Sequence, residues 1–243
     1  TAFKLSLNDS VRIPPVDFLK KKSVATNKID SDQFKIIQDN ILFEDDFLIV
    51  LNKPSGTAVH GGSGLSFGVI ELVRNARPDH KFFELAHRID KNTSGVLLIA
   101  KKRSALVGIH KQMREKKIHK KYQAVVKGIW KEKQKIVDLD LLKTTANNGQ
   151  QKVRVVESPQ SNPLAKASRS VFFLKKNFSS YSLLDVKLIT GRTHQIRTHL
   201  SHLGFPIVGD DKYGDFTLNK DLKKIGLKRM LLHSAELGFI HPA

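Results

Sequence analysis

Cysteine is absent from the 243-residue sequence, so the protein can form no disulfide framework, thiolate nucleophile or cysteine metal site. Apolar runs are short as well, and none approaches the roughly 20 residues that a membrane-spanning helix needs. No signal peptide is visible at the start of the sequence. We therefore expect a cytoplasmic protein that makes no use of a membrane.

Acidic residues are scarce relative to basic ones. The sequence has 23 Asp and Glu against 42 Lys and Arg, which gives a formal net charge of 42 − 23 = +19. A positive excess of this size predicts a polyanionic partner, and nucleic acid is the first candidate. The length allows one large domain or two small ones, with ample material for a hydrophobic core. We expect the protein to act as a monomer.

The first 35 residues have the weakest globular pattern. Segment Val11–Val16 predicts one short strand ended by prolines, and the basic run Lys20–Lys22 with the polar residues after it is typical of a linker. The sequence begins with Thr1 rather than Met, so we expect it to be a piece of a longer chain. We place a boundary between an N-terminal segment, 1–35, and a globular domain, 36–243.

Hydrophobic patterning predicts several strands in the globular domain. One or two strands are expected around an acidic turn within 42–51. Further strands are expected over 96–100 and 120–128, and as antiparallel neighbours over 168–174 and 181–189. The polar region 144–166 flanks a basic strand candidate at 152–156 and predicts a long hairpin or excursion that could touch RNA.

Helices are expected at three places. Ser66 and Ser104 are candidate N-caps of the first two, and Pro78 ends the first of them. For the third, Thr193 is the candidate N-cap and Gly204 the C-terminal stop, and one apolar face is formed by Ile196, Leu200 and Leu203.

The residues His87–Gly95 precede the apolar strand and predict a turn that carries Asp90. A carboxylate on a loop fixed by a buried strand can remain ionised and point into a cleft, which suits a nucleophile or a base. Two structural interpretations stay open at this point. Asp90 could bond the backbone of the following turn, or it could form an ion pair with Arg88.

Lys120, Lys121 and Tyr122 begin a strand in which alternation places Tyr122, Ala124 and Val126 on one face. An aromatic ring beside cationic residues can stack on an extruded base while the lysines contact phosphates. The alternative is a tyrosine at the edge of the core, since aromatic residues favour strands in general.

The start of the third helix is a candidate anion site, because its N–H groups lie close in sequence to Arg192 and Arg197. A phosphate or a carboxylate would fit there. Three histidines also occur in this region, His194, His199 and His202, but their i, i+5 and i+8 spacing does not place them on one helix face. We therefore predict no metal site.

Several motifs, taken together and in order, resemble those of the RluA/RluC/RluD-type pseudouridine synthases. The resemblance extends from about residue 41 to the end, and it is strongest to members that modify large-subunit ribosomal RNA. Ile89 and Ser234 differ from the commoner Leu and Ala without removing a functional group. Segment 11–16 is similar to the tail of an S4-type RNA-binding domain that often precedes this catalytic domain. The motifs are Asn52–Gly56, His87–Asp90 with Thr93–Gly95, Lys120–Ala124, Gly191–Arg197, and Leu232–Ala235 with His241–Pro242.

The resemblance implies an α+β fold with a long, mixed, largely antiparallel sheet, flanking helices and a central active-site cleft. It also implies an isomerase that converts uridines of 23S (large-subunit) ribosomal RNA to pseudouridine without cofactor or metal. In this interpretation Asp90 is the catalytic aspartate, Tyr122 the ring that stacks on the base, and Arg197 the partner of the aspartate. The implied substrate-binding residues are Lys53, Arg88, Lys120, Lys121, Arg192, His194 and Ile196.

Two other classes explain part of the pattern. A non-catalytic RNA-binding module accounts for the charge and for Tyr122, but it leaves Asp90 as a carboxylate that repels phosphate. A carboxylate-pair glycosidase accounts for Asp90 but needs a second acid to protonate the leaving oxygen. The matched motifs contain no such acid.

Overall fold

A computed structural model describes residues 31–61, 67–145, 151–156 and 162–243. Ten strands form one sheet in the order β1-β2-β4-β10-β5-β9-β8-β6-β7, with β3 paired to β4. The strands are β1 (Ile41–Glu44), β2 (Leu48–Lys53), β3 (Glu84–Leu85), β4 (Ser94–Ala100), β5 (His119–Lys127), β6 (Gln134–Thr145), β7 (Gln151–Val156), β8 (Lys166–Asn177), β9 (Tyr181–Leu188) and β10 (Leu232–Gly238).

Five helices flank this sheet in the described part of the chain: α1 (Ser31–Gln38), α2 (Val69–Ala76), α3 (Arg103–Arg114), α4 (Gln195–His202) and α5 (Phe216–Lys224). None of them is both long enough and apolar enough to cross a membrane. Helix α1 crosses the boundary placed at residue 36, and residues 11–16 lie outside the described part.

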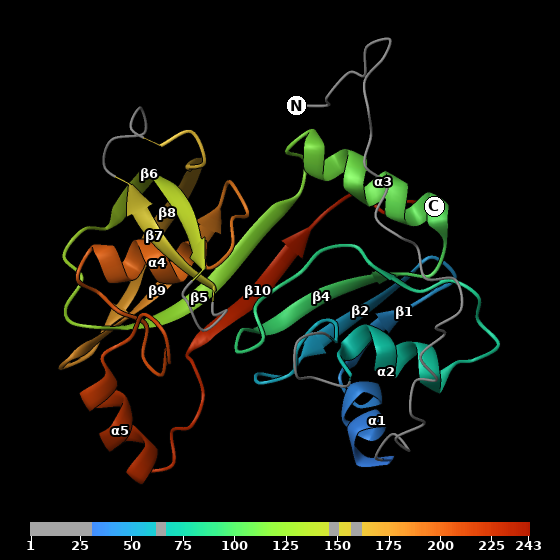
Figure 1. Ribbon diagram of the computed structural model, residues 1–243, viewed down its shortest axis with the longest axis horizontal. Coiled ribbons are helices and arrows are strands. Elements are labelled where there is room, and N and C mark those ends of the chain that lie inside the picture. Colours follow the sequence, from blue (N-terminus) through green and yellow to red (C-terminus); the bar gives the residue numbers. More distant parts are fainter. Residues whose placement is uncertain (1–30, 62–66, 146–150, 157–161) are drawn as a thin grey trace.

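The pairings are antiparallel except for β10 with β4, which is parallel. The prediction of a mixed, largely antiparallel sheet is therefore confirmed. Strands β10 and β5 cross the middle of the molecule, between β1, β2 and β4 on one side and β6 to β9 on the other (Figure 1). The expected antiparallel neighbours at 168–174 and 181–189 are β8 and β9.

Helices α2 and α3 cover opposite faces of β2 and β4 because neighbouring residues of a strand point to opposite faces. Ile49, Leu97 and Ile99 pack with the buried face of α2. Leu48, Leu98 and Ala100 pack instead with Ala105 and Ile109 of α3. This double burial explains the continuous apolar run before α3.

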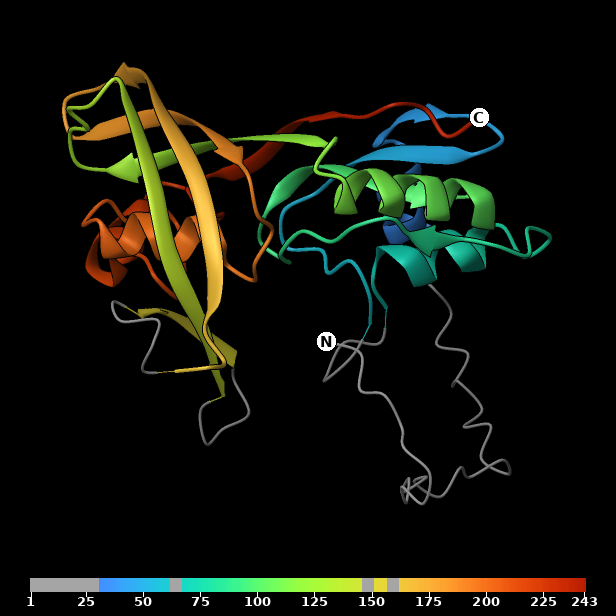
Figure 2. The ribbon, with the colours of Figure 1, turned by 90° about the horizontal axis from the view of Figure 1, so that it is seen from above.

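The larger of the two apolar clusters continues across the sheet from α2 to α4. It includes Ala124 and Val126 of β5, Phe172 of β8, and Ile196 and Leu200 of α4. Helices α2 and α4 thus lie on the same face of the sheet and flank its central strands. On the α4 side the β6–β7 hairpin projects from the body of the molecule (Figure 2).

The helix starts differ from the predicted caps. Ser104 lies in the first turn of α3, whose N-cap is Lys102, and Thr193 is not the cap of α4, which begins after His194. Gly68 is the N-cap of α2, and Ser66 lies outside the described residues. N-cap preferences are statistical, and helix ends are commonly displaced by one or two residues from the expected cap.

The predicted helix ends are confirmed. Helix α2 ends at Ala76, before Pro78. Gly204 follows α4 with φ +81°, and its N–H donates to the Ser201 carbonyl while that of Phe205 donates to the Leu200 carbonyl. These two bonds form a Schellman motif, in which glycine adopts the left-handed conformation at little cost.

Candidate active site

A cavity of about 260 Å³ opens over the central strands. It is lined by the loop before β4, the start of β5, the end of β9, the segment 191–197 and Leu232 of β10. The predicted site residues that it brings together are Arg88, Asp90, Lys120, Tyr122, Arg192, His194, Ile196 and Arg197.

The Asp90 loop is fixed where β4 meets β10. The Thr93 N–H donates to the Asp90 carbonyl at 3.1 Å and closes the predicted turn. Gly95 has φ +108°, and a Cβ atom there would lie 2.1 Å from the Ser234 carbonyl oxygen of β10. Only glycine permits this approach, so Gly95 is required for the parallel pairing that places Asp90 over the sheet.

Arg197 forms an ion pair with the Asp90 carboxylate. Its Nη1 lies 3.2 Å from Asp90 Oδ2, as the resemblance implied, but its tighter partner is Asp210. Nε and Nη2 donate to the two Asp210 oxygens at 2.8 and 2.7 Å, and Nη2 also lies 3.2 Å from Asp211 Oδ1. Burial disfavours the charged guanidinium, but the hydrogen bonds and charge of Asp210 outweigh it, so the pKa of Arg197 is raised.

Asp210 is a fixed anion rather than a proton donor. Its side chain is fully buried, and Oδ1 also accepts the N–H groups of Lys212 and Tyr213 at 2.8 and 3.0 Å. Burial raises the pKa of a carboxyl group, but the hydrogen bonds and charge of Arg197 prevail, and the pKa of Asp210 is lowered. Asp210 is therefore unsuited to be the second acid of a glycosidase.

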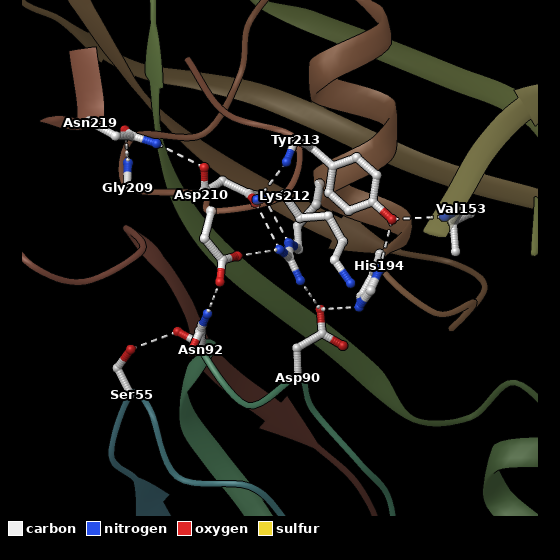
Figure 3. Close-up of polar contacts among 12 residues, drawn as sticks. Ser55, Asp90, Asn92, Val153, His194, Gly209, Asp210, Lys212, Tyr213 and Asn219 are labelled. Atoms are coloured by element: carbon white, nitrogen blue, oxygen red, sulfur yellow. Dashed lines mark hydrogen bonds and ion pairs between the residues drawn. The ribbon is translucent and has the colours of Figure 1, made fainter. Parts of the chain in front are cut away.

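His194 also lies beside Asp90. Its Nδ1 lies 2.8 Å from the Tyr213 hydroxyl, which also accepts the N–H of Val153 from β7 at 2.8 Å (Figure 3). The hydroxyl can donate its proton to Nδ1, and in that tautomer the imidazole carries its hydrogen on Nε2, which lies 3.9 Å from Asp90 Oδ2. Burial lowers the pKa of His194 against the opposing charge of Asp90.

His194 has φ +52°, in the left-handed region that non-glycine residues rarely adopt. Gln195, which sequence reasoning left without a role, anchors the backbone around it. The Gln195 amide accepts the Arg192 N–H at 3.0 Å and donates to the Arg169 carbonyl at 3.0 Å. Hydrogen bonds of the buried Gln195 side chain thus hold the strained backbone at His194, as is common at functional sites.

Tyr122 lies in the floor of the cavity with only 7% of its surface exposed. It pairs with Ser234 of β10 in the sheet register. Burial raises the pKa of Tyr122 to about 12, so its hydroxyl stays protonated at neutral pH. Ile196, in the first turn of α4, contributes apolar surface to the same cavity and is 5% exposed.

Two residues of the predicted binding set lie elsewhere. Lys53 is fully buried, and its ammonium donates to the carbonyls of Pro54, Thr57 and Lys91, so it supports the Asp90 loop from behind. Lys121 points to the face opposite Tyr122, because strand residues alternate, and pairs with Asp185 at 3.4 Å. Neither lysine lines the cavity, so the structure does not place them with the other predicted site residues, and their role as substrate contacts stays a prediction.

The candidate anion site at the start of α4 contains protein carboxylates, since Arg197 binds Asp90, Asp210 and Asp211. Arg192, by contrast, is exposed at the rim of the cavity. Within the described ranges no group of three or more potential ligand side chains could hold a metal ion.

Sequence reasoning missed Asp210 and Tyr213. Both lie in the segment Gly209–Gly214, which has no helical or strand period. One signal was available, because Asp210 and Asp211 are adjacent acids in a strongly basic chain, shortly after an arginine-rich motif. A pair of this kind suggests a partner for a buried cation.

Comparison with known proteins defines the class to which this fold and site belong. The family model described as RNA pseudouridylate synthase matches residues 47–202. The chain belongs to this family of isomerases, which confirms the resemblance found in the sequence motifs.

Its relatives include "Ribosomal large subunit pseudouridine synthase C" from Haemophilus influenzae, 46% identical over 240 residues, which are 99% of this chain and 72% of the relative. The protein of the same name from Escherichia coli is 46% identical over 242 residues, covering 99% and 74% of the two chains.

Two solved human structures share the α+β fold. RNA Pseudouridylate Synthase Domain Containing 1 superposes with a TM-score of 0.68 at 25% identity, over 82% of this chain and 77% of the other. RNA Pseudouridylate Synthase Domain Containing 4 superposes with a TM-score of 0.67 at 26% identity, over 85% of this chain and 86% of the other.

Proposed function

We propose that the protein converts specific uridines of 23S, large-subunit ribosomal RNA to pseudouridine, without a cofactor, as a cytoplasmic monomer. The names of its relatives support this substrate. The net charge of +19 suits a polyanion of that size. Segment 1–35 is proposed to contain the tail of an S4-type RNA-binding domain and a linker, ahead of a catalytic domain over 36–243.

The position of Asp90 is the observation that carries the proposal. Oδ2 is held by Arg197, while Oδ1 makes no hydrogen bond within the described residues and belongs to a side chain that lines the cavity. An oriented carboxylate with one uncommitted oxygen can attack the sugar C1′ or remove a proton from the sugar. The uracil then leaves, turns and rejoins through C5, which loses its hydrogen as a proton.

Tyr122 is proposed to stack on the extruded uracil. A base placed between this ring and Ile196 would gain roughly 1–3 kcal/mol from stacking. Since the Tyr122 pKa is about 12, a phenolate base is disfavoured, and its hydroxyl acts as a hydrogen-bonding group. Three basic residues of the cavity lining are proposed to contact RNA phosphates: Arg88, Lys120 and Arg192.

Release of tritium from uracil C5 tests the proposal, because C5 must lose its hydrogen when it becomes the glycosidic carbon. Wild type should release tritium from C5-labelled 23S ribosomal RNA without loss of base from the RNA. Asp90→Asn should abolish release while leaving folding and RNA affinity largely intact, since it keeps volume but removes charge.

Tyr122→Phe is the companion variant. It should bind RNA normally, because the stacking ring remains, while releasing tritium slowly. If wild type binds the RNA but releases no tritium, the protein is a binding module rather than an isomerase. Substantial multiple turnover by Asp90→Asn would remove Asp90 from the mechanism.

A further inference from the structure

A second groove, of about 470 Å³, adjoins the active-site cavity. The two share Lys120, Leu188, Gly191 and Arg192 in their walls. From this shared wall the groove extends along the end of β9 to the C-terminal end of α3. A chain that leaves the cavity over the shared wall would therefore enter this groove.

The groove is cationic, with apolar surface between the charges. No aspartate or glutamate lies among the described residues that line it. Glu115, next to it in the chain, is paired with Lys117 at 2.8 Å. Ile118, Leu188 and Ile189 contribute apolar side chains. Its five lysines and arginines are Arg114, Lys116, Lys120, Lys187 and Arg192.

Lys116 occupies a backbone position that favours glycine. It has φ +58°, and with His194 it is one of two non-glycine residues with positive φ in the described chain. Its N–H donates to the Met113 carbonyl at 3.2 Å, and that of Lys117 donates to the Gln112 carbonyl at 2.9 Å. These are the bonds of a Schellman motif, and the same motif after α4 has Gly204 at the equivalent place.

A lysine in this conformation is strained, and strain that persists in a structure commonly marks a functional position. The strained residue here directs a cation into a groove that is already basic. The Lys116 side chain is exposed and lies in the groove lining. Glycine would give the helix a more stable end but would remove this charge.

We propose that this groove binds the backbone of the single-stranded RNA flanking the target uridine, with Lys116 as a phosphate contact. The proposal rests on the proposed function, because it takes the cavity as the site of the uridine. A basic groove with apolar surface for bases or riboses is the combination that single-stranded nucleic acids require. The shared wall gives the strand a continuous path from the cavity.

The test separates folding from binding because the two should move in opposite directions. Lys116→Gly should raise the melting temperature by about 2 °C through relief of strain. The same variant should bind single-stranded oligouridylate about three- to tenfold more weakly at 0.1 M salt. Its salt slope should fall by about 0.7 log units per log unit of salt, the value for one lost phosphate contact.

Two further variants control for backbone and charge. Lys116→Asn keeps a residue that tolerates positive φ and should show the same loss of affinity with little change in stability. Lys111→Ala removes one charge from an exposed position of α3 outside the groove and should leave affinity nearly unchanged. Oligouridylates of two and eight nucleotides, compared by fluorescence anisotropy, locate the effect, since only the longer one should distinguish wild type from Lys116→Gly.

The proposal is overturned if Lys116→Gly binds the longer oligomer like wild type, or if Lys111→Ala loses as much affinity. It is also overturned if wild type binds polyglutamate of equal charge as tightly, since the groove would then accept any polyanion. Tritium release by wild type is scored separately. If wild type releases tritium but Lys116→Gly binds RNA normally, the proposed function stands and the groove proposal fails. If Lys116→Gly binds RNA more weakly but wild type releases no tritium, the groove binds RNA and the proposed function fails.

Discussion

Two buried cations flank the Asp90 loop, and they hold it in different ways. Lys53 is fully buried and donates to three neutral carbonyl oxygens, at 2.8 Å from Pro54, 2.7 Å from Thr57 and 3.0 Å from Lys91. Arg197 is 4% exposed and donates to carboxylates. The lysine fixes the path of the backbone, and the arginine fixes the position of a charge.

The pKa values of the two residues move in opposite directions for this reason. Burial lowers the pKa of Lys53 to about 8, and the charge of Asp90 opposes that shift only in part. For Arg197 burial acts the same way, but Asp210 prevails and the pKa rises. A buried cation bound to carbonyls can therefore lose its proton more easily than one bound to carboxylates.

Replacing Arg197 should have the largest effect. Arg197→Ala leaves Asp210 buried without its partner, and we expect a loss of about 3–5 kcal/mol in the free energy of unfolding together with loss of tritium release. Arg197→Lys keeps the charge but not the two parallel bonds, so it should fold and still turn over poorly. Urea unfolding and single-turnover assays measure the two effects. A cost below about 1 kcal/mol for Arg197→Ala would contradict the description of Asp210 as dependent on it.

Replacing Lys53 should affect folding more than chemistry. Lys53→Met leaves three carbonyls without their donor, and we expect a loss of about 2–4 kcal/mol, since some of them will regain water. The Asp90–Arg197 contact remains, so turnover per folded molecule should fall less than in Arg197→Lys. Lys121→Met, which removes an exposed ion pair, is the control and should cost at most about 1 kcal/mol. Equal losses of unfolding free energy in the two lysine variants would show that the buried bonds of Lys53 stabilise the fold no more than an exposed ion pair does.

The low pKa of Lys53 predicts a specific pH dependence. Between about pH 8 and the ordinary lysine pKa of 10.5 the unfolded chain binds a proton at this lysine that the folded protein has lost. Stability from this residue should therefore increase with pH across that window, by at most about 1.4 kcal/mol per pH unit. Urea unfolding of wild type and Lys53→Met from pH 7.5 to 10 isolates the contribution. A constant difference between the two proteins would show that Lys53 stays charged.

Tyr213→Phe should have a smaller effect than Arg197→Ala or Lys53→Met. It leaves the buried Val153 N–H without an acceptor and His194 without its hydroxyl partner, at a cost of about 1–3 kcal/mol, with the lower end expected because β7 is short. Turnover should fall several-fold because the His194 ring is no longer fixed beside Asp90. Thermal unfolding and the pH profile of tritium release measure the two consequences, and an unchanged profile would limit Tyr213 to a structural role.

The sequence predicted those parts of the fold that depend on local pattern. The apolar run of β4, the alternation of β5 and the glycine after α4 all give signals within a few residues, and the structure confirms each. The motifs also predicted that Asp90, Tyr122 and Arg197 share one site, because the three segments that carry them match one family.

Local sequence patterns did not predict side-chain contacts whose two partners are distant in sequence. Lys53 resembles a surface lysine until its carbonyl partners, including that of Lys91, are known, and Lys121 needed the rule of alternation that was applied to Tyr122. Asp210 gives no periodic signal because it lies in a loop. Long-range pairing of charges depends on the tertiary structure, and no local window contains it.

Strand β10 is the last strand along the described chain, yet it lies between β4 and β5 at the centre of the sheet. During synthesis the two sides of the sheet can collapse separately, and β10 can join them only after its own residues have emerged from the ribosome. Until then β4 and β5 lack the strand that pairs with both of them. We therefore expect a nascent chain that lacks β10 to be inactive, because Asp90 and Tyr122 are not yet held by one continuous sheet.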